Sequence, residues 1–261
     1  MPTKLGQNFL RDADVIQKII NSADLQPNDF VIEIGPGEGV LTEELVKYAK
    51  KVIAIEIDPF LAKKLAEKFK NTPNVEIIMA DILRINLPDL AAKYKIPDTK
   101  YKVVANLPYY ITSPIIRLLL EAQIKPREMI LMVQKEVAER IVAKPGKMSI
   151  LAVSVQYYAE PKLLFEVSKK AFCPVPKVDS AVIKIVNISQ KNTSLEETKK
   201  FFRLVRAGFC AKRKTLANNT TSSLKIDKKL VEEKLKKIGL SSNVRAQELS
   251  VEKWKNFLDT L

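Results

Sequence analysis

The hydrophobic positions of the chain change period several times. Short runs of apolar, β-preferring residues alternate with stretches in which apolar residues recur every three or four positions. The runs predict strands and the wider spacing predicts helices. Their alternation is typical of an α/β protein with a doubly wound, mostly parallel, Rossmann-like sheet, with an antiparallel element late in the series. We predict strands over Phe30–Ile34, Lys51–Ile57, Val75–Ala80, Tyr101–Ala105, Met129–Val133, Ser149–Tyr158 and Val178–Val186.

Capping residues and helical spacing predict the helices that accompany these strands. They run from Asp12 or Asp14 through Ile20, from Val40 onward, from Asp58 and Pro59 through Phe69, and within a helix and loop over Pro88–Asp98.

The last quarter of the chain has only helical spacing. It follows a polar segment, Asn187–Ser194, and Ser194 with Glu197 fits a capping box. Trp254 and Phe257 share one face of the last helix, where we expect core packing. We therefore predict two domains, residues 1–188 and a small all-helical domain over residues 189–261. The predicted helices of the second domain are Leu195–Ala211, Asp227–Ile238 and Val251–Leu261.

Composition narrows the chemistry. The 261 residues include no histidine, which excludes Ser-His-Asp and Cys-His catalysis and His-ligated metals, and we expect no metal. The two cysteines, Cys173 and Cys210, lack metal spacing and are expected to be buried free thiols. No apolar run approaches 18 residues and the first 14 residues lack an apolar signal region, so we expect a soluble, cytoplasmic protein without a membrane segment.

The chain is strongly basic, with 44 Lys and Arg against 30 Asp and Glu and a net charge of +14. Seven basic residues and no acidic one lie between Lys199 and Lys214. Phosphates of a nucleic acid explain such a cluster well, although a solvated lysine-rich face is the alternative. The RNA-binding candidates are Arg203, Arg206, Lys212, Arg213 and Lys214.

Three of the seven glycines lie at alternate positions, Gly35, Gly37 and Gly39, between the first predicted strand and the helix at Val40. A dinucleotide site usually has G-x-G-x-x-G, whereas the G-x-G-x-G form is more typical of S-adenosylmethionine-dependent methyltransferases. An ordinary tight turn is the alternative. The turn therefore predicts a cofactor site, and S-adenosylmethionine is the expected cofactor.

Two carboxylates end the next predicted strands. Glu56 lies 21 residues after Gly35, at the distance where a carboxylate can accept hydrogen bonds from both hydroxyls of a ribose. Asp81 can accept from an exocyclic amine such as that of adenine. Ligands of doubly wound sheets collect at the carboxyl ends of the strands, so we expect Gly35, Glu56, Asp81 and Asn106 to line one crevice.

Asn106-Leu107-Pro108-Tyr109 follows the fourth predicted strand. The side-chain oxygen of Asn106 and the carbonyl of Leu107 can accept both N–H bonds of a purine amine, which frees the nitrogen lone pair for attack on a methyl group. Pro108 would hold Leu107 extended, and Tyr109 would lie against the base. Taken alone, the motif could equally be a strand-to-helix turn with a buried tyrosine.

Taken together, these motifs resemble those of the KsgA/RsmA ribosomal RNA adenine dimethyltransferases, and the resemblance covers nearly the whole length of the chain. The shared motifs are Gln7–Leu10, Glu33–Gly39, Asn106–Tyr109, Val133–Arg140, Phe172–Ser180 and Lys212–Leu216. The resemblance implies a methyltransferase domain with a helical C-terminal domain. It also implies dimethylation at N6 of two adjacent adenosines near the 3′ end of small-subunit rRNA, within an immature small ribosomal subunit, by a monomer.

The same resemblance implies residue roles. Asn8 and Leu10 would contact the methionine end of the cofactor, Gly35 and Gly37 would pass beneath it, and Phe172 would stack on the base opposite Tyr109. Glu56 and Asp81 would bind the ribose and the adenine, and Asn106 would contact both cofactor and target amine. Without the resemblance, Phe172 reads as a core residue.

Three other functions stay open at this stage. The first is a large-subunit rRNA dimethyltransferase that confers antibiotic resistance, although Leu107, the Gly-Pro-Gly turn and Pro174–Ser180 favour the small-subunit group. The second is a catalytically silent assembly or nucleic-acid-binding factor. The third is a small-molecule methyltransferase, which leaves the basic cluster unexplained.

Overall fold

The computed structural model describes residues 8–97, 101–189 and 194–261. Gln7, Asp98 and most of the predicted linker after Ile188 lie outside these ranges. The chain divides into two compact units: residues 1–138 with 159–190, and residues 139–158 with 191–261. The division differs from the predicted one because Glu139–Tyr158 joins the helical unit.

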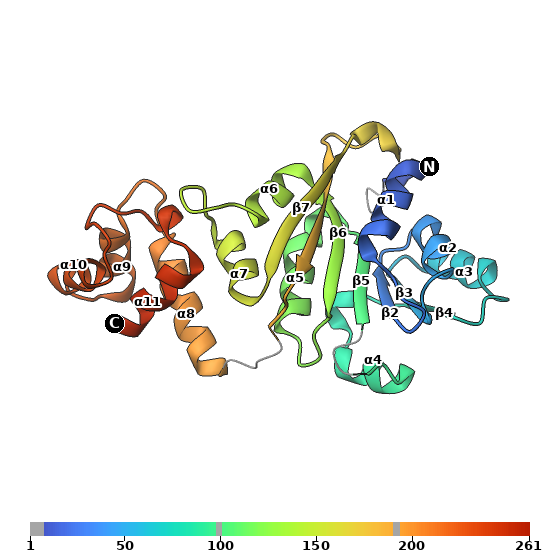
Figure 1. Ribbon diagram of the computed structural model, residues 1–261, viewed down its shortest axis with the longest axis horizontal. Helices are drawn as coiled ribbons and strands as arrows, with labels where there is room; N and C mark the ends of the chain where they lie inside the picture. The colour runs from blue at the N-terminus through green and yellow to red at the C-terminus, as the bar shows by residue number, and fades with distance from the viewer. Residues whose placement is uncertain (1–7, 98–100, 190–193) are drawn as a thin grey trace. The chain divides into compact units, whose positions relative to one another are not determined.

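The first unit is built on a seven-stranded sheet with the order β4-β3-β2-β5-β6-β9-β7 (Figure 1). The five strands β2 to β6 pair in parallel, and β9 pairs antiparallel with both β6 and β7. The sheet strands are β2 (Phe30–Ile34), β3 (Lys51–Glu56), β4 (Val75–Met79), β5 (Tyr101–Asn106), β6 (Glu128–Gln134), β7 (Glu160–Val167) and β9 (Ser180–Val186). The predicted mostly parallel, Rossmann-like sheet with a late antiparallel element is confirmed.

The helices and turns of this unit connect the strands or precede them. They are α1 (Ala13–Ala23), α2 (Val40–Leu45), α3 (Pro59–Lys68), the 3₁₀ turn η1 (Ile82–Arg84), α4 (Leu87–Tyr94), η2 (Tyr109–Ile111), α5 (Thr112–Glu121) and η3 (Lys169–Ala171). Asp12 caps α1 and Asp58 caps α3, each by accepting backbone N–H bonds. Both helices therefore begin where the capping residues in the sequence predict.

A core on one face of the sheet joins α1 and α2 to the central strands. Ile19 and Ile20 from α1 and Leu41 and Leu45 from α2 lie in one buried cluster with residues of β2, β3, β5, β6 and β9. A separate two-stranded ribbon pairs β1 (Phe9–Leu10) antiparallel with β8 (Phe172–Cys173). The segment before α1 is therefore held by a segment from late in the chain.

The second unit is all-helical. It contains α7 (Ile150–Tyr158), α8 (Leu195–Gly208), α9 (Leu216–Leu224), α10 (Lys228–Lys237), the turn η4 (Ala246–Glu248) and α11 (Val251–Thr260), while α6 (Lys135–Ile141) crosses the division between the units. Trp254 and Phe257 are buried in its core, as predicted. No helix in the described residues is long and apolar enough to cross a membrane.

The prediction of a strand over Ser149–Tyr158 is wrong, because this segment forms helix α7. The Ser149 hydroxyl accepts from the backbone N–H of Ala152, and Ala152 and Val153 pack with Phe201 in the core of the helical unit. Periodicity alone does not separate a buried helix from a buried strand in such an apolar run, and here the tertiary packing decides.

The prediction of buried cysteines is also wrong. Both thiols are free, as expected, but both are exposed. Successive residues of a strand face opposite sides, so in the two-residue strand β8 the buried Phe172 leaves Cys173 facing outward. Cys210 follows the end of α8, next to the exposed basic segment.

Candidate cofactor pocket and methyl-transfer site

A cavity of about 360 Å³ lies at the carboxyl ends of β2, β3 and β5. This size falls in the usual range for small-molecule sites. Ten predicted site residues line it together: Asn8, Leu10, Gly35, Gly37, Glu56, Asp81, Asn106, Leu107, Pro108 and Tyr109. The expected convergence of these motifs on one crevice is therefore observed, although the role of each residue stays a prediction.

Phe172 does not line this cavity. Its ring is 3% exposed and lies in the core cluster that includes Leu10, the residue opposite it in the β1–β8 ribbon. Stacking on a base would require this ring to be uncovered. Tyr110 lies at the cavity instead, with 63% of its surface exposed.

The glycine turn needs its glycines for backbone geometry. Gly35, Gly37 and Gly39 all have positive φ, a region that L side chains rarely adopt. At Gly37 an added Cβ would also lie 3.1 Å from the Phe9 ring, and at Gly39 it would lie 2.8 Å from Leu65. The turn is tied to β3 by a hydrogen bond from the Gly35 N–H to the Ile55 carbonyl, at 2.9 Å.

Glu56 connects the end of β3 to that turn. Its Oε2 accepts from the Gly37 N–H at 3.1 Å, and its Oε1 accepts from the Asp58 N–H at 3.0 Å. Each carboxylate oxygen has a second lone pair, so Glu56 can still accept from the hydroxyls of a ribose. Burial raises the pKa of Glu56, and these backbone hydrogen bonds oppose that rise.

Asp81 caps η1 by accepting from the Leu83 N–H at 3.0 Å, and it lies 3.6 Å from the Arg84 guanidinium. The capping bond fixes the carboxylate at the end of β4, where it lines the cavity. One carboxylate oxygen thus faces backbone while the other is ion-paired at the surface.

Glu33 is an acidic group of the cavity that the motif reasoning did not assign. Its carboxyl is 1% exposed in the middle of β2, and its Oε2 accepts from the Thr42 hydroxyl at 2.6 Å. The pKa of Glu33 is raised to about 8, mainly by burial; the hydrogen bond from Thr42 opposes this rise and nearby Glu56 adds to it. The available signal was a charged residue inside an otherwise apolar strand, Phe-Val-Ile-Glu-Ile.

The cavity is acidic in a strongly basic chain. Glu33, Glu38, Glu56 and Asp81 all line it. S-adenosylmethionine has a sulfonium and an ammonium group against one carboxylate, so the carboxylates of Glu38, Glu56 and Asp81 complement its net positive charge. Acceptors for ribose and adenine, exposed backbone at a glycine turn and a carboxamide at Asn106 make up a donor and acceptor set that fits this cofactor.

The fold and this site define the class: the protein is an S-adenosylmethionine-dependent methyltransferase with a Rossmann-like sheet. Residues 1–261 match the family model described as Ribosomal RNA adenine dimethylase. The chain therefore belongs to the ribosomal RNA adenine dimethylase family.

Relatives with high identity share one name, Ribosomal RNA small subunit methyltransferase A. The one from Dehalococcoides mccartyi (strain CBDB1) is 48% identical over 253 residues, which cover 96% of this chain and 85% of the relative. The one from Streptococcus gordonii (strain Challis) is 43% identical over 262 residues, covering 98% of this chain and 90% of the relative.

Two crystal structures are similar over both units. The 23S rRNA methyltransferase ErmE is 31% identical with a TM-score of 0.77, covering 97% of this chain and 99% of that one. A dimethyladenosine transferase from Plasmodium falciparum is 25% identical with a TM-score of 0.79, covering 95% of each chain.

Proposed function

We propose that this protein transfers methyl groups from S-adenosylmethionine to the N6 amines of two adjacent adenosines near the 3′ end of small-subunit rRNA, dimethylating each. The observation that carries the proposal is the convergence of the glycine turn, Glu56, Asp81 and Asn106–Tyr109 on one cavity, in a chain 48% identical to a protein named Ribosomal RNA small subunit methyltransferase A.

When bound, S-adenosylmethionine supplies a methyl group made electrophilic by its sulfonium. The residues of this chain have to position and prepare the amine. Asn106 and the Leu107 carbonyl accept the two N–H bonds of N6, which favours a pyramidal nitrogen with its lone pair directed at the methyl carbon. Most of the rate enhancement then comes from positioning, and the displaced N6 proton passes to solvent.

The segment around these acceptors is firmly held. The Leu107 N–H donates to the Met132 carbonyl at 3.0 Å, and the Ile111 N–H donates to the Pro108 carbonyl at 3.2 Å. Tyr109 offers a ring at the cavity against which the target base can lie. We keep the stacking of Phe172 on the opposite side of the base as a prediction that depends on uncovering its buried ring.

The RNA would be held through phosphate contacts of the helical unit. Arg203 and Arg206 are exposed one turn apart on α8, and Lys212, Arg213 and Lys214 are exposed before α9. Because the amine of a paired adenine is engaged, the target has to be unpaired or flipped out of a helix. We infer an immature small ribosomal subunit as substrate, acted on in the cytoplasm by a monomer without a metal.

The similarity to ErmE, a 23S rRNA methyltransferase, favours one second candidate, dimethylation of large-subunit rRNA. The deciding experiment measures transfer of labelled methyl groups from S-adenosylmethionine to small ribosomal subunits that lack the modification, followed by mapping of the labelled nucleotides. Two adjacent dimethylated adenosines near the 3′ end are expected. Labelling of large-subunit rRNA would favour the second candidate, and binding without labelling would identify an assembly factor.

A further inference from the structure

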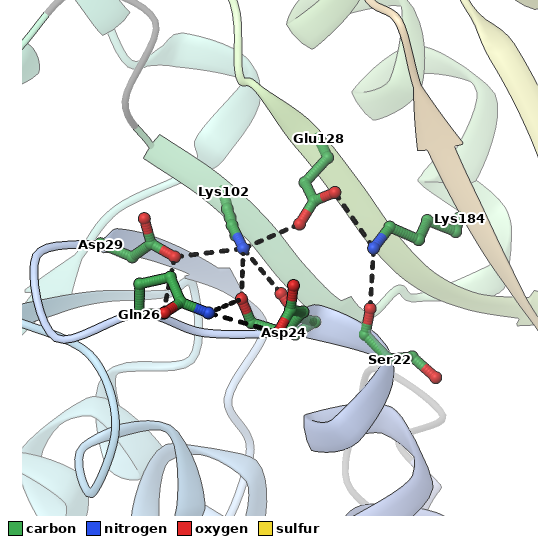
Figure 2. Close-up of polar contacts among 8 residues, drawn as sticks. Ser22, Asp24, Gln26, Asp29, Lys102, Glu128 and Lys184 are labelled. Atoms are coloured by element: carbon green, nitrogen blue, oxygen red, sulfur yellow. Dashed lines mark hydrogen bonds and ion pairs between the residues drawn. The ribbon is translucent and has the colours of Figure 1, made fainter.

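Two lysines contact the C-terminal end of α1 near the amino ends of β5 and β6 (Figure 2). We call Lys102, Lys184, Asp29 and Glu128 the lysine clamp. Lys102 is 3% exposed on β5, and its Nζ lies 2.8 Å from the carbonyl oxygens of both Ala23 and Asp24. It also lies 3.1 Å from Asp29 and 2.9 Å from Glu128.

Lys184 extends the clamp from β9. Its Nζ donates to the Ser22 carbonyl at 3.0 Å and lies 3.1 Å from Oε2 of Glu128, whose Oε1 pairs with Lys102. Asp29 in turn accepts from the Gln26 N–H at 2.9 Å. The two lysines thus join β5 and β9 to three consecutive carbonyls, those of Ser22, Ala23 and Asp24.

These carbonyls belong to the helix end, where oxygens lack partners within the helix and the helix dipole is negative. The last turn of α1 has no basic residue of its own. Both cations come from the sheet instead, so their effect is to fix α1 against β5 and β9. Two lysines and two carboxylates balance in charge, which makes their burial tolerable.

The opposite end of α1 leads directly to the cavity. Phe9 and Leu10 form β1 and line the cavity with Asn8, and the Arg11 N–H donates to the Ala171 carbonyl at 2.8 Å. Arg11 also pairs with Glu38 of the glycine turn. The Phe9 ring lies against Gly37, because a Cβ added there would be 3.1 Å from that ring.

A helix of 11 residues is a rod about 16 Å long, so fixing one end restricts the other. We infer that Lys102 is a positioning residue for cofactor binding, which holds α1 so that Asn8–Leu10 stay in place at the cavity. The inference rests on the proposed function, since it assigns those three residues to the S-adenosylmethionine site. Lys102 itself touches neither the cavity nor the reacting atoms.

The test compares Lys102→Met and Lys184→Met with wild type. Lys102→Met should weaken S-adenosylmethionine binding, measured by calorimetry, by about five- to tenfold, and Lys184→Met should show a smaller effect because Lys184 is only partly buried. The KM for S-adenosylmethionine should rise in parallel while kcat at saturation stays within about twofold. Backbone amides of Phe9–Asp12 should exchange hydrogen for deuterium faster than in wild type.

Lys125→Met is the matched control. Lys125 is another buried lysine of the same unit, and its Nζ donates to the Ser189 carbonyl at 2.9 Å. It should lower the melting temperature without changing the cofactor Kd. If Lys102→Met does not fold, the double variant Lys102→Met, Asp29→Asn takes its place in the test, because it also removes the Asp29 carboxylate that the single substitution leaves unpaired.

Wild-type affinity in a folded Lys102 variant, or equal weakening in the Lys125 control, would overturn the inference. A wild-type protein that binds no S-adenosylmethionine would instead refute the proposed function, so the two failures are distinguishable.

Discussion

The phenol oxygen of Tyr109 lies 2.8 Å from the hydroxyl oxygen of Ser180. The two residues are 71 positions apart, one in the turn after β5 and the other fully buried at the start of β9. The bond therefore joins the ends of two motifs, Asn106–Tyr109 and Phe172–Ser180. It fixes the tilt of the Tyr109 ring at the cavity.

Two substitutions of Tyr109 should distinguish the contribution of its ring to activity from that of its hydroxyl. Tyr109→Phe keeps the face and loses the bond, so we expect kcat/KM for rRNA to fall only a few-fold, as in Ser180→Ala. Tyr109→Ala also loses stacking, worth about 1 to 3 kcal/mol, so kcat/KM should fall roughly ten- to hundredfold. Steady-state methyl transfer measures both effects, and a Phe variant as impaired as the Ala variant would refute the stacking role.

Asn106→Ala removes the side-chain acceptor for the target amine. We expect kcat to fall about a hundredfold or more, a loss comparable to removing one preorganised polar group from a reaction centre. RNA affinity should stay near wild type, since the proposed phosphate contacts lie in the helical unit. Single-turnover transfer and filter binding separate the two quantities. Near-normal turnover in this variant would be incompatible with the proposed preparation of the amine.

Glu33 predicts a specific pH dependence of stability. The unfolded carboxyl ionises near 4.5, while burial raises the native pKa to about 8, so the native state binds the extra proton between these values. Its contribution to stability is present in full below pH 4.5 and is lost as the pH rises through about 8. Relative to Glu33→Gln, the wild type should therefore lose a few kcal/mol in free energy of unfolding between pH 5 and pH 9.

Urea unfolding of both proteins at several pH values measures this difference. Thr42→Val offers a second check, because loss of the hydrogen bond from Thr42 removes an influence that lowers the pKa of Glu33. The fall in stability should then extend to higher pH. A wild type and a Glu33→Gln variant with parallel profiles would contradict the assignment.

Neutralising Lys212, Arg213 and Lys214 together should weaken RNA binding and flatten its dependence on salt. Each lost phosphate contact on a single strand lowers the slope of log affinity against log salt by about 0.7, so we expect a decrease of about 2. Cofactor affinity should not change. The control neutralises Lys229, Lys236 and Lys237, three exposed residues in the first and last turns of α10, with the same change in net charge. Equal effects of both triple variants would show that only net charge matters.

The sheet and the cavity could be predicted because their signals are local. Apolar strands ending in Gly35, Glu56, Asp81 and Asn106 need only the rule that ligands collect at the carboxyl ends of parallel strands. Strand β7 was missed for a local reason as well: it lies at the sheet edge, has mostly exposed residues and carries Pro161.

The remaining features depend on contacts between distant segments. The helical state of α7 follows from its packing with Phe201, and the burial of Phe172 follows from its pairing with Leu10. In the sequence, Lys102 is a single basic residue within a predicted strand. Nothing in the neighbouring residues predicts that it contacts the carbonyls of Ala23 and Asp24. No periodicity in a single sequence encodes such pairs.

The clamp and the β1–β8 ribbon also set the order in which the protein can be completed during synthesis. Lys184 contacts Ser22 across 162 residues, and Phe9 pairs with Cys173. A nascent chain that has emerged only as far as β6 has made the glycine turn, Glu56, Asp81 and Asn106, yet cannot hold Asn8–Leu10 in their final place. The pocket is therefore finished by one of the last strands to leave the ribosome.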